Sequence, residues 1–187
     1  MDYRIISIGT LSKHPLWDRS QAARTAHATT TLIRTNEKTI LVDPALPEQV
    51  LGARLAERAG ISLGDVTDVF LTCFRPAHRM GLAALGNANW WISEAEREAV
   101  GVSLIGQLEQ VGAADGELAE MLKQEIALMQ RCKAAPDKLD HQVDLFPLPG
   151  FTPGTCGLLL SLAGATVLVA GDAVATSEHL ERAMVLE

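Results

Sequence analysis

The segment from Leu71 to Gly81 (LTCFRPAHRMG) places three reactive side chain types close together, a thiol at Cys73, a guanidinium at Arg75 and an imidazole at His78. A thiolate and an imidazole can bind a metal ion or act in nucleophilic catalysis, and a guanidinium binds anions. The residues before Cys73 are apolar, as in a strand that leads into a loop. This pattern predicts a functional loop at the end of a strand.

Two aspartates lie at comparable places, because Asp43 ends the apolar run 39–43 and Asp172 follows the apolar run 166–170. A carboxylate that is desolvated at such a site needs a partner. Arg75 is one candidate, since a guanidinium pairs well with a carboxylate. We predict a nitrogen of Arg75 or His78 within ~4 Å of one of these two carboxylates.

The elements that would position these side chains alternate between strands and helices. Pro47 and Gly60 delimit a predicted helix, and Ser93 with Glu96 predicts a capping box that opens a second helix at Glu94. A polar linker is expected over 136–141. Strands are predicted at 4–9, 28–35, 39–43, 66–72, 89–92, 143–148, 157–162 and 166–170. The order predicts a mixed α/β fold with hairpins and excludes strict βαβ alternation.

Four sequence blocks in this order resemble the metallo-β-lactamase superfamily. They are TILVDP at 39–44, GDVTDVFLT at 64–72 with the loop that follows it, PGFTPGT at 149–155 and VAGDAV at 169–174. The resemblance implies an αββα sandwich with its site at one edge of the two sheets. It also implies a single domain over 1–187 that is shortened at its C-terminal end.

The resemblance further implies where metal ligands would lie. The superfamily pattern HxHxDH falls on Cys73, Arg75, Ala77 and His78, so one histidine of the pattern is present. Phe151 stands where the PGHTPG loop of the superfamily supplies a histidine, and Asp172 matches the aspartate that bridges two metals. An arginine repels a dication at short range, and a phenyl ring has no lone pair to donate. We therefore expect the binuclear site to be largely lost.

These residues support three hypotheses on function. The first is a non-catalytic or impaired hydrolase homologue without a cofactor, which binds a small anionic ligand or regulates through this vestigial site. The second is a hydrolase of esters, thioesters or lactones with one zinc or iron on Cys73, His78 and Asp172. The third is metal-free thiol chemistry by Cys73 with His78. Both residues could instead have only a structural role. His78 would then form a hydrogen bond with a loop carbonyl or with Asp172, and Cys73 would be a small buried thiol in the core.

The amino-acid composition argues against some classes of binding partner. The formal net charge of −7 argues against a nucleic acid or an anionic membrane surface as the binding partner. No apolar run approaches the ~18 residues of a membrane span. Three widely spaced cysteines are typical of a reducing compartment, so the cytoplasm is expected.

The C-terminal segment is the basis for a prediction about the oligomeric state. Residues 176–186 are predicted to form a short helix rather than another strand, which would leave a sheet edge open. A homodimer is therefore expected, with the C-terminal region and one of Trp90 and Trp91 in the contact.

Overall fold

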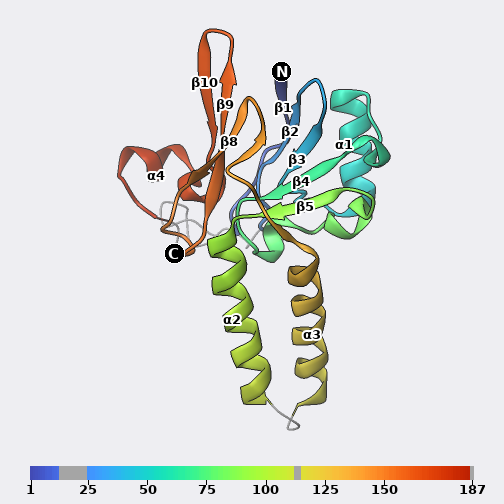
Figure 1. The fold of residues 1–187 in the computed structure, drawn as a ribbon, viewed down its shortest axis with the longest axis vertical. Coiled ribbons are helices and arrows are strands. Elements are labelled where there is room, and N and C mark those ends of the chain that lie inside the picture. Colours follow the sequence, from blue (N-terminus) through green and yellow to red (C-terminus); the bar gives the residue numbers. More distant parts are fainter. Residues whose placement is uncertain (13–24, 112–114, 186–187) are drawn as a thin grey trace, which may run out of the picture. The chain divides into compact units, whose positions relative to one another are not determined.

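The structure is a computed structural model that describes residues 1–12, 25–111 and 115–185 (Figure 1). These residues form two compact units. The first comprises Met1–Leu71 with Arg75–Ala88, and the second comprises Thr72–Phe74 with Asn89–Glu187. The loop that follows the strand at 68–71 is thus divided between them, with Cys73 in the second unit and His78 in the first.

The first unit is built on four strands in the order β1-β2-β3-β4. Strands β1, β2 and β3 pair antiparallel, and β3 pairs parallel with β4. Pro47 is the N-cap of the helix Glu48–Ala59, and Gly60 ends it in the left-handed region at φ 67°. The elements are β1 (Asp2–Ser7), β2 (Thr30–Arg34), β3 (Thr39–Val42), α1 (Glu48–Ala59) and β4 (Asp68–Leu71), with 3-10 helices at Leu63–Asp65, Pro76–His78 and Leu82–Leu85.

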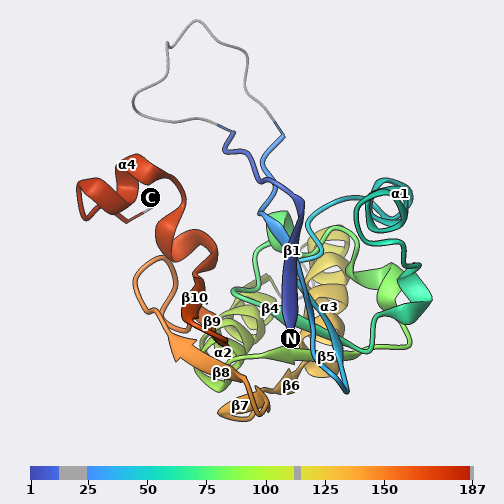
Figure 2. The ribbon, with the colours of Figure 1, turned by 90° about the horizontal axis from the view of Figure 1, so that it is seen from above.

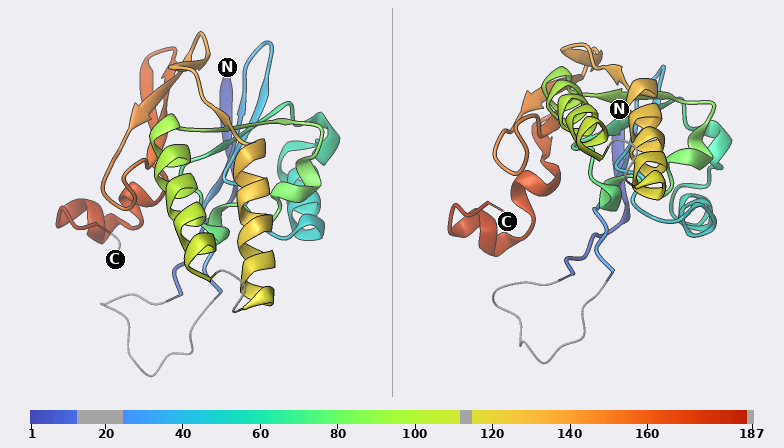
Figure 3. Two further views of the ribbon diagram at one scale, coloured as in Figure 1. Left: turned by 60° about the horizontal axis from the view of Figure 1, so that its bottom comes forward. Right: turned by 90° about the horizontal axis from the view of Figure 1, so that it is seen from below.

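The second unit contains a parallel strand pair, a helical hairpin and an antiparallel sheet. Strand β5 (Asn89–Ile92) pairs with β6 (Lys133–Ala134). Between them in sequence come α2 (Glu94–Val111) and α3 (Gly116–Arg131), which lie side by side in both views of Figure 3. The sheet has the order β10-β9-β8-β7. Its strands are β7 (Lys138–Asp140), β8 (Val143–Pro147), β9 (Cys156–Leu162) and β10 (Ala165–Val169), and α4 (Ser177–Glu181) follows (Figure 2).

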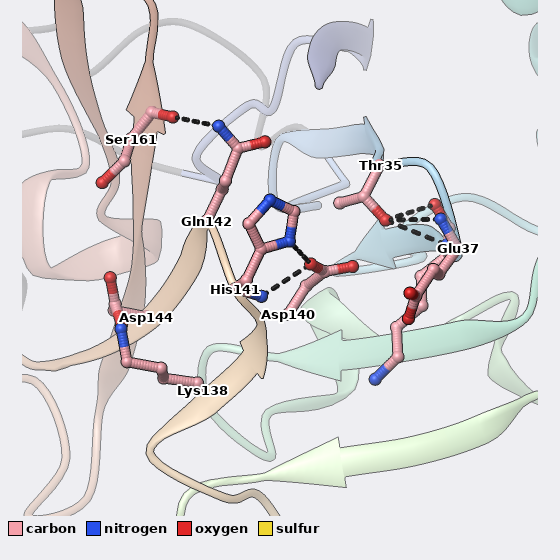
Figure 4. A network of polar contacts seen from close by, with 9 residues as sticks. Thr35, Glu37, Lys138, Asp140, His141, Gln142, Asp144 and Ser161 are labelled. Atoms are coloured by element: carbon pink, nitrogen blue, oxygen red, sulfur yellow. Dashed lines mark hydrogen bonds and ion pairs between the residues drawn. The ribbon is translucent and has the colours of Figure 1, made fainter.

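The linker predicted over 136–141 is wrong in part, because Lys138–Asp140 forms β7 and pairs with β8 across a bulge. Leu139 is buried between two polar neighbours, so this short alternation is a strand. Figure 4 shows how the turn after β7 is held. Asp140 Oδ1 accepts from the backbone N–H of His141 at 2.6 Å and lies 2.5 Å from His141 Nδ1, and Lys138 Nζ lies 2.6 Å from Asp144 Oδ1.

The core of each unit is aliphatic, as the low aromatic content requires. Strands β3 and β4 are almost entirely buried, since Ile40, Leu41, Val69 and Phe70 expose 0% of their surface. Trp90 on β5 is buried beneath the guanidinium of Arg131, 3.6 Å from the ring centroid, while Trp91 is half-buried. None of the helices in the described part of the chain is both long enough and apolar enough to cross a membrane.

Candidate functional site

Asp43 occupies the first residue after β3, at the edge where parallel strands β3 and β4 both end. Its N–H donates to the carbonyl oxygen of Phe70 on β4 at 3.0 Å. Its carbonyl oxygen accepts from Thr30 Oγ1 at 2.7 Å. These bonds hold the backbone of Asp43 at φ 48°, in the left-handed region that few residues other than glycine adopt. Such backbone strain at a strand end is typical of a functional site.

Within this unit the side chain of Asp43 pairs with His78. Asp43 Oδ2 lies 3.1 Å from His78 Nδ1, and the two side chains expose 1% and 0% of their surface. The prediction of an Arg75 or His78 nitrogen near one of the two carboxylates is thus confirmed for His78 and Asp43. Asp43 is thus one partner of His78, and the loop carbonyl or Asp172 suggested from the sequence stays a prediction.

The loop around His78 is fixed by backbone contacts. Pro76 begins the 3-10 turn Pro76–His78, and the carbonyl oxygen of Ala77 accepts from the N–H of Ala28 at 2.9 Å. A Cβ atom at Gly81 would lie 2.5 Å from the carbonyl oxygen of Leu46, so this position requires glycine. In the same loop Arg75 is exposed and Ala77 is half-buried. The imidazole of His78 is therefore held in place, while Arg75 is exposed.

In the second unit, a buried carboxylate that sequence reasoning missed joins two loops. Glu96 exposes 1% of its surface although it lies in the first turn of α2. Its Oε1 accepts from the backbone N–H of Phe74 at 3.0 Å, and its Oε2 accepts from Thr152 Oγ1 at 2.5 Å. Glu96 thus connects the segment at Cys73 and Phe74 with the loop at Phe151 and Thr152.

The capping box predicted from Ser93 and Glu96 is half formed. Ser93 Oγ accepts from the N–H of Glu96 at 3.1 Å, as that motif requires, and donates to the carbonyl oxygen of Gly154 at 2.6 Å. The Glu96 carboxylate, however, turns to the two loops described above. The spacing Ser-x-x-Glu identified both residues, but it predicted a local role for a side chain whose partners lie 22 and 56 residues away in the sequence.

The loop at 149–155 packs directly on the start of α2. A Cβ atom at Gly154 would lie 2.0 Å from the backbone nitrogen of Glu96. Thr155 Oγ1 accepts from the N–H of Thr152 at 3.0 Å and lies 2.7 Å from Thr152 Oγ1. The glycine and the threonines of this loop therefore place Phe151, which is half-buried, in a fixed backbone.

The second unit also contains the candidate residues Cys73 and Asp172. Cys73 exposes 0% of its surface. Asp172 is half-buried in the 3-10 helix Gly171–Val174, three residues after β10. The preceding Gly171 has φ 55°, and a Cβ there would lie 2.4 Å from Thr72 Oγ1. A glycine before Asp172 is thus needed both for the backbone angle and for the approach to Thr72.

Three positions that resemble metal ligands of the superfamily carry side chains that do not bind a metal ion. The positions that resemble the superfamily's ligands carry an exposed guanidinium at Arg75, a methyl group at Ala77 and a phenyl ring at Phe151, none of which donates a lone pair to a metal. Within residues 1–12, 25–111 and 115–185, no group of three or more His, Cys, Asp and Glu side chains is arranged to hold a metal ion. His78 Nδ1 is engaged with Asp43.

Comparison with known proteins identifies the fold. No protein-family model and no curated protein matches the sequence. Solved structures do match. AidC, a dizinc quorum-quenching lactonase in complex with a product, aligns with a TM-score of 0.60 at 22% identity, over 76% of this chain and 55% of AidC. A protein from Thermotoga maritima assigned to the metallo-β-lactamases aligns with a TM-score of 0.64 at 19% identity, over 90% and 76% of the two chains.

AiiA from B. thuringiensis, with N-decanoyl-L-homoserine bound at its active site, aligns with a TM-score of 0.64 at 19% identity, over 97% of this chain and 78% of AiiA. The protein therefore has the mixed α/β fold of the metallo-β-lactamases, which confirms the fold predicted from its sequence. The chain spans 55% of the length of AidC and 58% of the length of the hydrolase AbOPH.

Proposed function

We propose that this chain is a non-hydrolytic protein of metallo-β-lactamase fold that binds a small anionic ligand or acts in regulation. The observation that carries the proposal is the buried Glu96 carboxylate, which joins the segment at Phe74 to the loop at Thr152 by direct hydrogen bonds. By the resemblance, both of these segments would carry metal ligands and be held by ions. In this chain the Glu96 side chain supplies a direct cross-link between the two loops, which supports the proposal.

An anionic ligand is favoured by the exposed Arg75, with Arg79 four residues further along the same loop. A guanidinium forms paired hydrogen bonds with a carboxylate or a phosphate, and two cations in one loop are notable in a chain of net charge −7. The ring-opened homoserine compounds bound by structural neighbours are carboxylates of a suitable size to serve as probes.

The test combines metal analysis with binding. Protein purified without chelators is expected to contain far less than one zinc or iron per chain and to leave N-hexanoyl homoserine lactone intact. The carboxylate N-hexanoyl-L-homoserine should bind more tightly than the neutral lactone, and Arg75→Gln should remove that difference. Arg54→Gln is the matched control, since Arg54 is an exposed cation on α1 that pairs with Glu57. About one tightly held metal per chain together with lactone hydrolysis would overturn the proposal.

A second candidate, a single-metal hydrolase of esters, thioesters or lactones, is favoured by the pair of His78 and Asp43. A histidine that ligates a metal usually donates its second ring N–H to a carboxylate, and this contact improves metal affinity by 10- to 100-fold. His78 would be the ligand, with Cys73 and Asp172 as the other two donors in this hypothesis. Cys73→Ser and Asp43→Asn should then each lower the metal content and the hydrolysis together. Unchanged metal content in both variants would exclude this candidate.

A further inference from the structure

Strand β10 forms one end of the antiparallel sheet in the second unit. The sheet order is β10-β9-β8-β7, so the described residues give β10 one strand neighbour, β9. An outer strand leaves a row of backbone N–H and C=O groups that can pair with another strand. Proteins usually protect such an edge with charged side chains, with proline or with a bulge.

None of these protective features is present on β10. Its sequence is Ala-Thr-Val-Leu-Val, and its register with β9 is continuous over all five residues, from Ala165 opposite Leu162 to Val169 opposite Leu158. Residues 145–171 contain no Asp, Glu, Lys, Arg or His, although 21% of the whole chain is charged. The edge is therefore regular, uncharged and rich in β-branched residues.

The side chains of β10 are incompletely covered. Val167 lies opposite Leu160 and Val169 lies opposite Leu158, and both leucines expose 0% of their surface. The two valines point to the same face but are only half-buried. On the other face Leu168 is 41% exposed. A further strand beside β10 would cover all three side chains.

The backbone groups that point outward can be assigned from the pattern of β9. The backbone N–H of Ser161 donates to the carbonyl oxygen of Gln142 at 3.0 Å, and the backbone N–H of Leu148 donates to the carbonyl oxygen of Thr155 at 2.9 Å. The backbone groups of odd-numbered residues on β9 therefore point toward β8. In an antiparallel ladder the even-numbered residues then pair with β10, through Ala165, Val167 and Val169. The N–H and C=O groups of Thr166 and Leu168 consequently point away from the sheet.

We infer that β10 is an interaction surface for a second copy of this chain, with the two β10 strands antiparallel about a two-fold axis. Antiparallel pairing is self-complementary, because Thr166 and Leu168 each supply a donor and an acceptor to the partner. Like charges directly opposite each other would oppose such pairing, and β10 carries no charged residue that could form such a pair. A basic or acidic peptide would gain no charge pair here, which favours a second copy as the occupant.

The association state tests this inference. Because a pair of five-residue strands buries less than a standard interface of ~1,600 Å², we expect reversible dimers that form as concentration rises from ~5 µM to ~200 µM. Sedimentation velocity should then approach twice the chain mass of 20.0 kDa. Leu168→Lys should weaken dimerisation by at least ~10-fold, because the two lysines would lie diagonally across the axis on the same face of the sheet. Leu180→Lys is the matched control, since Leu180 lies on α4 and is 67% exposed.

Amide exchange of the wild-type protein gives a second measurement that needs no variant. The amides of Thr166 and Leu168 should exchange more slowly at the higher concentration, while the amide of Val167, already paired with β9, should be protected at both. These shifts and the loss of dimer in Leu168→Lys would support the inference. A monomer at both concentrations would overturn it. So would a dimer that resists Leu168→Lys but dissociates in Leu180→Lys, because the contact would then lie at the C-terminal helix.

Discussion

His78 Nδ1 lies 3.1 Å from Asp43 Oδ2, and both side chains are buried. Asp43 is also one of two residues other than glycine with a positive φ in the described part of the chain. A buried carboxylate is costly unless a partner compensates it. His78 provides such a partner for Asp43, so the pair holds the imidazole close to the end of β3.

His78→Ala should therefore destabilise the protein by about 3 kcal/mol, because it removes the imidazole that pairs with the buried Asp43 carboxylate. Urea unfolding at pH 7 measures this free energy. Asp43→Asn and the double variant complete a cycle, in which the two single effects should not add. Arg75→Ala is the comparison within the same loop. Since Arg75 is exposed, we expect its effect to stay under ~1 kcal/mol. Equal effects of the two alanine variants would contradict this assignment.

Glu96→Ala should cost about 2 to 4 kcal/mol, because it removes the acceptor of the Phe74 N–H and the partner of the Thr152 hydroxyl. Glu96→Gln should cost less, since an amide can accept from Phe74 and donate to Thr152. Glu98→Ala serves as the control on the same helix, because Glu98 is exposed and should contribute within ~0.5 kcal/mol. Three similar unfolding midpoints would show that the network adds little stability.

Gly154→Ala should be severely destabilising, by roughly 3 kcal/mol or more, because the added Cβ would meet the backbone of α2 at Glu96. The backbone cannot move aside without breaking the bond from Ser93 to Gly154. Gly106→Ala provides a control of opposite sign. A Cβ at Gly106 meets nothing within 4 Å, so this change in α2 should stabilise by up to ~1 kcal/mol. In thermal melts, the midpoint of Gly154→Ala should lie below that of the wild-type protein and the midpoint of Gly106→Ala should lie above it.

Burial raises the pKa of the Cys156 thiol from its ordinary value of 9.0 to about 11. Above pH 9 the unfolded chain releases this proton while the folded protein retains it, so stability should fall as pH rises from 9 to 11. Cys156→Ala should reduce that fall. Urea midpoints at pH 8 and pH 10.5 for both proteins measure the difference. An equally steep loss in the variant would assign the pH dependence to other groups.

All three cysteines are buried in the described structure. We therefore predict slow labelling of Cys73, Cys132 and Cys156 by iodoacetamide at pH 7, at similar rates in the native protein. Peptide mass spectrometry after timed quenching distinguishes the three sites. Labelling of Cys73 much faster than that of the other two would instead support the thiol chemistry considered from the sequence.

Local sequence patterns determined much of the fold. Alternating and continuous apolar runs located most of the strands, and Pro47 with Gly60 located both ends of α1, because these signals act within a few residues. Asp43 could be named as a site residue for the same reason, since an acidic residue directly after a buried strand lies at a sheet edge. The expectation that Arg75, Ala77 and Phe151 do not bind a metal ion stays a prediction, and it rests on residue type alone.

The partners of those residues were decided by tertiary structure. His78 meets Asp43 because β3 and β4 run parallel and end at one edge, which no local signal in either segment specifies. Glu96 has the spacing of a capping box, yet its carboxylate bonds residues 22 and 56 positions away. A buried carboxylate forms hydrogen bonds with the donors that lie near it in the folded chain. The free-energy cost of leaving it buried and unpaired exceeds the stabilisation from a single helix-capping hydrogen bond. Residue types thus follow from the sequence, and pairings follow only from the chain's packing.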